Sequence, residues 1–221
     1  MRKSIRAYAT VLTLGMTLLA CSSGQNGNQT DAGDPIAVES PMTISDNNLN
    51  LVNGKPQYLR LKLVRGKYYE DWSPGPIRGT VWEGDYSIEL ADEYGNVKAQ
   101  TDLSRYYHGP LIFMSHFQLE FDDYNGDGDI DFTIGQYASG NGWDYRLFTL
   151  RENGDIEELP IRDHSALFIS MHSGHSLKLE KIDSMSFKCV HYENSKQVWV
   201  ERVFRWDGEA FVRAESREVE L

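Results

Sequence analysis

The sequence has little cysteine, a shortage of positive charge and, after its first 20 residues, no long apolar run. No later segment approaches the roughly 20 apolar residues that a membrane-spanning helix needs, so the rest of the chain is expected to be soluble. The 22 Lys and Arg residues face 33 Asp and Glu residues, which gives a formal net charge of −11. Nucleic-acid binding needs Lys and Arg against phosphate, so no nucleic-acid partner is expected. Such an acidic surface suits a cation better.

The chain also lacks any amphipathic stripe of helical period that lasts three or more turns. Short runs of Val, Ile, Leu, Tyr, Phe and Trp instead alternate with Gly, Asn, Asp and Pro. This pattern predicts one all-β domain over residues 51–221, an antiparallel meander of hairpins that is either propeller-like or a β-sandwich. Residues 21–50 are polar and poor in large apolar side chains, which predicts a disordered tether.

Motifs for hydrolytic chemistry are missing as well. There is no Gly-x-Ser-x-Gly elbow, and the acidic pairs lie near turns, where a solvated surface explains them. His164, His172 and His175 fall in a Ser- and Gly-containing stretch and are expected to be solvated rather than zinc ligands. A non-catalytic module is therefore favoured. The alternative is an extracytoplasmic hydrolase that acts on a glycan or an envelope polymer.

The amino terminus reads as an export signal, with a basic start and an apolar run too short to span a bilayer as a mature helix. The stretch Leu18-Leu19-Ala20-Cys21 resembles the lipobox of bacterial lipoproteins. The resemblance implies that residues 1–20 form the signal peptide and that Cys21 carries a lipid. The protein would then be exported and anchored to the bacterial membrane or envelope. Cys189 would have no disulfide partner, and we expect it to be a small buried strand residue.

Oxygen-bearing side chains alternate along residues 123–131, which read Asp-x-Asn-x-Asp-Gly-Asp-x-Asp. Calcium takes about six to eight oxygen ligands, and a loop supplies several of them only when every second residue points inward. The segment therefore predicts a calcium loop. Its candidate ligands, at positions one, three, five, seven (a backbone carbonyl) and nine, are Asp123, Asn125, Asp127, Asp129 and Asp131.

The twelfth position of this loop is Ile134, where an EF-hand has a bidentate Glu. The flanking segments 111–121 and 132–137 are rich in β-branched and aromatic residues, which predicts strand, loop, strand. A loop of this kind resembles the integrin-type calcium loops of FG-GAP repeats. That resemblance implies that Asp131 completes the coordination and that calcium acts as a structural brace. The competing interpretation is a solvated acidic turn.

Two predicted hairpins match at a constant offset of 59 positions, from Tyr86 to Tyr145 and from Gly95 to Gly154. The match indicates either an internal repeat or two hairpins that look alike by convergence. Between the loop and the second hairpin lies a Gly-rich stretch, 138–143. Asn141 and Trp143 in this stretch are candidate contacts for a protein or glycan ligand, since Trp143 is expected to be exposed beside the metal.

Overall fold

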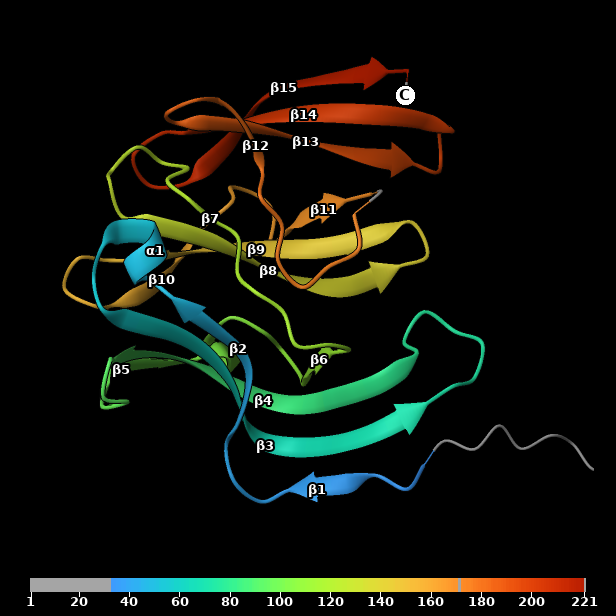
Figure 1. Ribbon diagram of the computed structural model, residues 1–221. Helices are drawn as coiled ribbons and strands as arrows, with labels where there is room; N and C mark the ends of the chain where they lie inside the picture. The colour runs from blue at the N-terminus through green and yellow to red at the C-terminus, as the bar shows by residue number, and fades with distance from the viewer. Residues whose placement is uncertain (1–32, 171, 221) are drawn as a thin grey trace, which may run out of the picture. The chain divides into compact units, whose positions relative to one another are not determined.

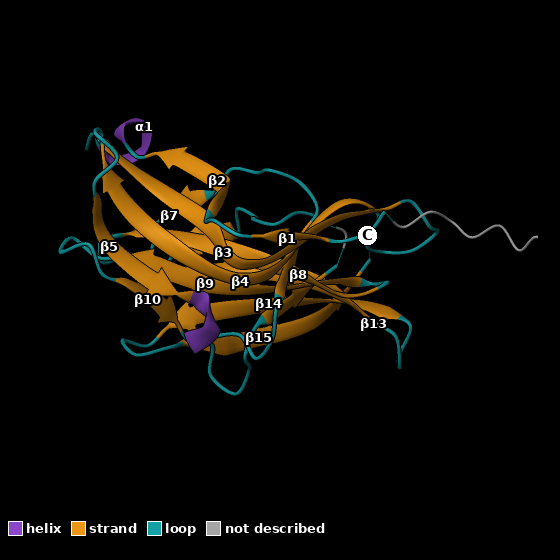
Figure 2. Ribbon diagram, turned by 90° about the horizontal axis from the view of Figure 1, so that it is seen from below, coloured by secondary structure: helices purple, strands orange, loops and turns teal. Residues whose placement is uncertain are grey.

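Strands form nearly all regular structure in the computed structural model, which describes residues 33–170 and 172–220. Helical structure in these ranges is limited to α1 (Asn50–Asn53) and a 3-10 turn, η1 (Leu103–Arg105) (Figure 2). The strands form three antiparallel sheets of meander hairpins, and none closes into a barrel or a propeller ring within the described ranges. The predicted all-β class is confirmed. In the same ranges, no helix is long and apolar enough to cross a membrane.

The first sheet is built on two long strands, β3 and β4, which pair along almost their whole length. β1 and β2 pair with β3, and β5 and β6 pair with β4. Its strands are β1 (Ile36–Val38), β2 (Met42–Asn48), β3 (Gln57–Asp71), β4 (Gly79–Asp92), β5 (Val97–Asp102) and β6 (Leu111–Phe113). Along β3 the apolar residues Leu59, Leu61 and Leu63 are buried and the residues between them are partly exposed, as the alternating sequence predicts.

The second and third sheets follow in chain order. The second contains β7 (Phe121–Asp122), β8 (Ile130–Ser139), β9 (Gly142–Leu150), β10 (Ile156–Leu159) and β11 (Leu167–Ile169). The third contains β12 (Glu180–Asp183), β13 (Ser186–Glu193), β14 (Val198–Trp206) and β15 (Phe211–Val219), paired in that order. Both are antiparallel, so short turns join most neighbouring strands.

The second sheet lies between the other two, as Figure 1 shows. Phe132 and Phe148, paired across β8 and β9, belong to the apolar cluster shared with the first sheet. Tyr145 and Leu147 point to the opposite face and belong to the cluster shared with Phe187 of the third sheet. Because successive side chains alternate between faces, this sheet supplies both cores at once. It is the layer on which the predicted calcium loop is built.

The folded body begins earlier than residue 51, so the predicted tether is wrong for residues 36–50. β2 pairs with β3, and Ile44 and Leu49 are 1% and 0% exposed. The segment is polar on average, but Ile44 and Leu49 fill positions in the first core. Average composition therefore failed to predict the strand β2. Residues 21–32 lie outside the described ranges.

The strand expected over residues 111–121 is interrupted. It pairs with the first sheet as β6, leaves it, and joins the second sheet as β7. Over the crossing, side chains distant in sequence accept the backbone N–H groups. Met114 donates to His175 Nε2 (3.0 Å), Leu119 to Asn47 Oδ1 (2.7 Å) and Glu120 to Ser176 Oγ (3.0 Å). These bonds replace strand pairing, which is why strand propensity alone was misleading here.

The two hairpins predicted to match at an offset of 59 have the same turn. In the first sheet Asp92 N–H donates to Asn96 O and Gly95 N–H to Asp92 O; in the second, Arg151 and Gly154 make the equivalent bonds. Gly95 and Gly154 both have positive φ, 85° and 93°. The β14–β15 turn is closed differently, with Asp207 N–H donating to Ala210 O, three residues on rather than four. Sequence correctly predicted which hairpins correspond.

Candidate metal loop

The loop between β7 and β8 folds its polar side chains back onto its own backbone. The Asp123 carboxylate accepts hydrogen bonds from Gly126 N–H (2.7 Å) and Gly128 N–H (3.2 Å). Asn125 Oδ1 accepts from Asp127 N–H (3.2 Å), and Asp127 Oδ1 accepts from Asp129 N–H (2.9 Å). Carboxylate and amide oxygens have two lone pairs each, so these bonds leave acceptor capacity for a cation.

Asp131 ends the loop inside the protein, with 0% of its side chain exposed. Its Oδ2 accepts a hydrogen bond from Tyr124 N–H (2.7 Å), but its Oδ1 is buried without any partner. Burial raises the pKa of Asp131 to about 7; the Tyr124 N–H and the Thr149 hydroxyl act against this shift, and the charges of Asp127 and Asp123 reinforce it. Thr149 pairs with Asp131 across β8 and β9, and its hydroxyl is likewise buried without a partner at hydrogen-bond distance, so an ionised Asp131 is only incompletely compensated by the protein.

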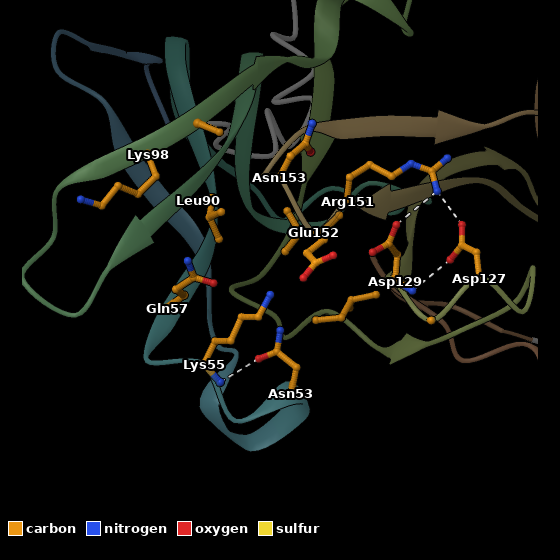
Figure 3. Close-up of a pocket in the computed structure, with 15 residues that line it drawn as sticks. Asn53, Lys55, Gln57, Leu90, Lys98, Asp127, Asp129, Arg151, Glu152 and Asn153 are labelled. Atoms are coloured by element: carbon orange, nitrogen blue, oxygen red, sulfur yellow. Dashed lines mark hydrogen bonds and ion pairs between the residues drawn. The ribbon is translucent and has the colours of Figure 1, made fainter.

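Arg151, at the start of the β9–β10 turn, binds the loop from the second sheet. Its Nη1 lies 2.5 Å from Asp127 Oδ2 and 3.3 Å from Asp129 Oδ2 (Figure 3). Its Nε lies 3.1 Å from Glu157 Oε2. Burial works against ionisation of Asp127, but hydrogen bonds from Asp129 N–H, Asn125 and Arg151 hold its pKa below the usual value. The guanidinium therefore partly neutralises two carboxylates of the loop, of which that of Asp127 is a predicted ligand.

The other side of the loop contacts the third sheet and the segment that leads into it. Lys181 Nζ donates to the Asp123 carbonyl and lies 3.1 Å from Asp122 Oδ1. The buried Tyr124 hydroxyl accepts a hydrogen bond from Leu179 N–H (2.9 Å), and the Tyr124 ring packs on Phe187. Whatever stabilises the loop therefore also stabilises the junction between the second and third sheets.

The donor types of the loop fit calcium, since they are carboxylate, amide and carbonyl oxygens. The unpartnered Oδ1 of Asp131 fits as well, because a cation would compensate it. The side chains do not converge into a finished cage. Among the residues that the structure describes, no group of three or more His, Cys, Asp or Glu side chains is placed to hold a metal ion. Coordination as predicted involves Asp127, a carboxylate that already pairs with Arg151.

A cavity of about 450 Å³ adjoins the loop. Figure 3 shows Arg151, Asp127 and Asp129 on one side of it, and Asn53 and Lys55, at the end of α1, on another. Residues from β4 and β5 and from the β9–β10 turn complete the lining. The cavity thus lies where the two matching hairpins meet the loop.

The two predicted ligand contacts lie far from the loop. β8 runs from Ile130 at the loop to Ser139 at the opposite turn, which for an extended strand is about 30 Å. Asn141 is partly exposed in that turn. Trp143 is only 8% exposed and packs against Tyr137 and His175, so the expectation that it is exposed beside the metal is wrong. Its Gly-rich neighbourhood indicated the turn but not the apolar cluster beneath it.

Sequence reasoning missed Arg151, Lys181 and Tyr124 as partners of the loop. Arg151 follows the loop by 20 residues or more and carries no local motif; the pairing of β8 with β9 brings it near the loop, and that pairing was not predicted from the sequence. His164 and His172 are exposed as expected, but His175 is buried. Cys189 is buried on β13, as expected, and burial raises its pKa to about 12.

The predicted signal peptide and the lipid-bearing Cys21 fall outside the described residues, so the structure says nothing of either. Comparison with known proteins matches the chain to no family and to no curated protein.

Proposed function

We propose that the protein is a calcium-binding module of the cell surface in which calcium braces the loop 123–131. The observation that carries this proposal is the buried Oδ1 of Asp131, at the ninth loop position, which has no hydrogen-bond partner. Leaving a buried carboxylate oxygen uncompensated costs free energy. A divalent cation held by the loop would remove that cost.

The local charge supports the same proposal. Residues 122–131 carry five carboxylates and are contacted by three cationic side chains, so this segment keeps an excess of two negative charges when all are ionised, without counting Glu157, which also pairs with Arg151. The carboxylates are Asp122, Asp123, Asp127, Asp129 and Asp131, and the cations are Arg151, Lys178 and Lys181. A single calcium ion carries the charge that balances this excess.

The proposed role of calcium is structural. When bound, the ion supplies positive charge and joins oxygen atoms from both ends of the loop. Asp123, Asn125, Asp127, the carbonyl of Asp129 and Asp131 would hold it. Since Tyr124 already fastens the loop to the segment before the third sheet and Lys181 fastens it to β12 of that sheet, calcium binding would be coupled to the stability of that junction.

The anchoring part of the proposal is based on sequence alone. Export and a lipid on Cys21 would tie the module to the bacterial membrane or envelope, with a protein or a glycan as its partner. The polar cavity beside the loop, rather than the distant Trp143, is where such a partner should be sought.

A calcium titration tests the proposal. Residues 22–221, which lack the lipid, are titrated with calcium by isothermal calorimetry, beside Asp131→Asn and the control Asp163→Asn. Asp163 is exposed and lies outside the loop. We expect one calcium per chain, unchanged affinity in the control and at least about tenfold weaker binding in Asp131→Asn. Absence of calcium binding to the native sequence at millimolar concentration would refute the proposal.

A further inference from the structure

We propose that Arg151 is a built-in counter-ion of the loop that pairs with the carboxylates of Asp127 and Asp129 and competes with calcium for that of Asp127. The inference deepens the proposed function and depends on it for the identity of the metal. Its basis is geometric: one guanidinium nitrogen, Nη1, lies within hydrogen-bond distance of both carboxylates, at 2.5 and 3.3 Å. These carboxyl-bearing residues hold positions five and seven of the loop.

The matching hairpin shows that the turn itself does not need an arginine. The residue equivalent to Arg151 is Asp92, which makes the same backbone bonds. Its carboxylate also accepts hydrogen bonds from Tyr94 N–H (3.0 Å) and Asn96 N–H (2.9 Å), so an acidic residue stabilises this turn. In the second sheet Asn153 takes over that task by accepting from Asp155 N–H (3.0 Å). Arg151 is thus free to serve the loop instead.

Competition follows from charge. Calcium bound to Asp127 would bring two positive charges to an oxygen that the guanidinium already contacts, and like charges at this distance repel even when water screens them. Either the guanidinium leaves or calcium binds more weakly. Arg151 therefore sets the calcium concentration at which the loop fills, and it neutralises the carboxylates at lower concentrations.

The structure gives the displaced guanidinium a place to go. Glu157 is the second residue of β10. Its Oε2 already lies 3.1 Å from Arg151 Nε, and its side chain is 56% exposed. Arg151 also lines the 450 Å³ cavity, so its side chain has room to turn from the loop. Asp131 is different, because none of the ion pairs of Arg151 reaches it. The guanidinium therefore covers the outer carboxylates of the loop and leaves the buried one for the metal.

The test compares the native sequence with Arg151→Gln and with the charge control Arg162→Gln, all over residues 22–221. Arg162 pairs with Asp207, outside the loop, so its loss removes one positive charge and one ion pair without changing any contact of the loop. Calcium affinity is measured by calorimetry, and thermal unfolding is followed in excess chelator and in millimolar calcium. We expect Arg151→Gln to bind calcium roughly three- to tenfold more tightly, to melt lower than the native sequence in chelator, and to regain most of that loss in calcium.

Each outcome separates this inference from the proposed function. Binding by Arg151→Gln alone would support the counter-ion role and refute calcium binding by the native chain. Equal or weaker affinity in Arg151→Gln, with calcium bound by the native sequence, would overturn the inference and leave the proposed function standing. A stability loss that calcium does not reduce would also overturn it, since it would make Arg151 a purely structural residue. Absence of binding in every variant would refute both.

Discussion

His175 is a neutral histidine enclosed by Phe113, Phe117 and Trp143. Its Nε2 accepts a hydrogen bond from Met114 N–H (3.0 Å), which assigns the ring proton to Nδ1, facing Gly135 O. Protonation would remove the acceptor that Met114 uses and place a charge in an apolar site. Burial therefore lowers the pKa of His175 to about 4.

We predict that His175 makes the protein less stable in acid. In the unfolded chain the histidine takes up a proton near its ordinary pKa of about 6.5, whereas the folded protein excludes it down to about pH 4. Its contribution is complete above pH 6.5 and falls by about 3 kcal/mol as the pH drops to 4. Urea unfolding at pH 7.5, 5.5 and 4.5 should show a shallower decline in His175→Gln, whose amide oxygen can accept from Met114. Equal declines in the two proteins would contradict the assignment.

At this scale the sequence predicted the residues whose role is local. The alternation of Asp and Asn marked the loop, and these side chains accept hydrogen bonds from backbone groups two to five residues away; their role as calcium ligands stays a prediction. Arg151 donates hydrogen bonds to Asp129 and Asp127, 22 and 24 residues away in sequence. His175 accepts one from Met114, 61 residues away. No local pattern encodes such a partner, so both were found only in the folded chain.

The turn of the loop between β7 and β8 depends on two glycines with different surroundings. Gly126 and Gly128 both have left-handed backbone, φ 77° and 86°. A Cβ on Gly126 would lie 3.1 Å from Ser184 O and from Met185 Cγ, whereas a Cβ on Gly128 would meet nothing within 4 Å. The first glycine therefore allows both the turn and close contact with the β12–β13 turn, and the second allows the turn alone.

We predict unequal costs for alanine at these two positions. Gly128→Ala should lower the free energy of unfolding by about 1 kcal/mol, from backbone strain only. Gly126→Ala adds the steric contact and should cost about 2 kcal/mol or more. Urea denaturation of both variants in excess chelator measures the difference without contribution from calcium. If the two variants were equally stable, the loop would not pack against the third sheet as described.

The amino-terminal strands allow a matched test of where the body begins. Ile44 of β2 is 1% exposed and Ile36 of β1 is 62% exposed. Ile44→Ala should therefore cost about 3 kcal/mol and Ile36→Ala less than about 0.5 kcal/mol. Thermal unfolding of both variants checks this, with a drop of about 6 to 12 °C expected for Ile44→Ala. An unchanged melting temperature in Ile44→Ala would contradict this account and favour the disordered tether that the composition predicts.

The sequence predicted strands correctly where the residues of a turn determine the hairpin. The hairpins around Gly95 and Gly154 were predicted because a glycine with positive φ marks each turn. The run 111–121 has comparable strand propensity, yet Asn47, His175 and Ser176 capture its N–H groups and divert it between sheets. Propensity reports what a segment prefers locally, and it contains no information on a competing acceptor that lies elsewhere in the chain.

At the scale of the whole molecule, the second sheet is buried on both faces, and the loop lies at one end of it. Ile134 packs toward the first sheet and Leu147 toward the third. Alternation in sequence indicates that a strand has two faces, but it does not say which sheet covers each. For this reason the sequence alone could not distinguish stacked sheets from a propeller-like ring. The loop contacts Arg151 of the second sheet on one side and Lys181 of the third sheet on the other, so it links two of the three layers.

Thermal unfolding in calcium and in chelator tests the central claim, that the loop is a calcium brace. Residues 22–221 are melted in excess chelator, in millimolar calcium and in millimolar magnesium, beside Asp127→Ala. At a calcium concentration about 100 times the dissociation constant, binding adds about 2.7 kcal/mol, which for a body of this size raises the midpoint by about 5 to 10 °C. We predict that rise in calcium and its loss in Asp127→Ala. Identical curves for the native sequence in calcium and in chelator would contradict the account.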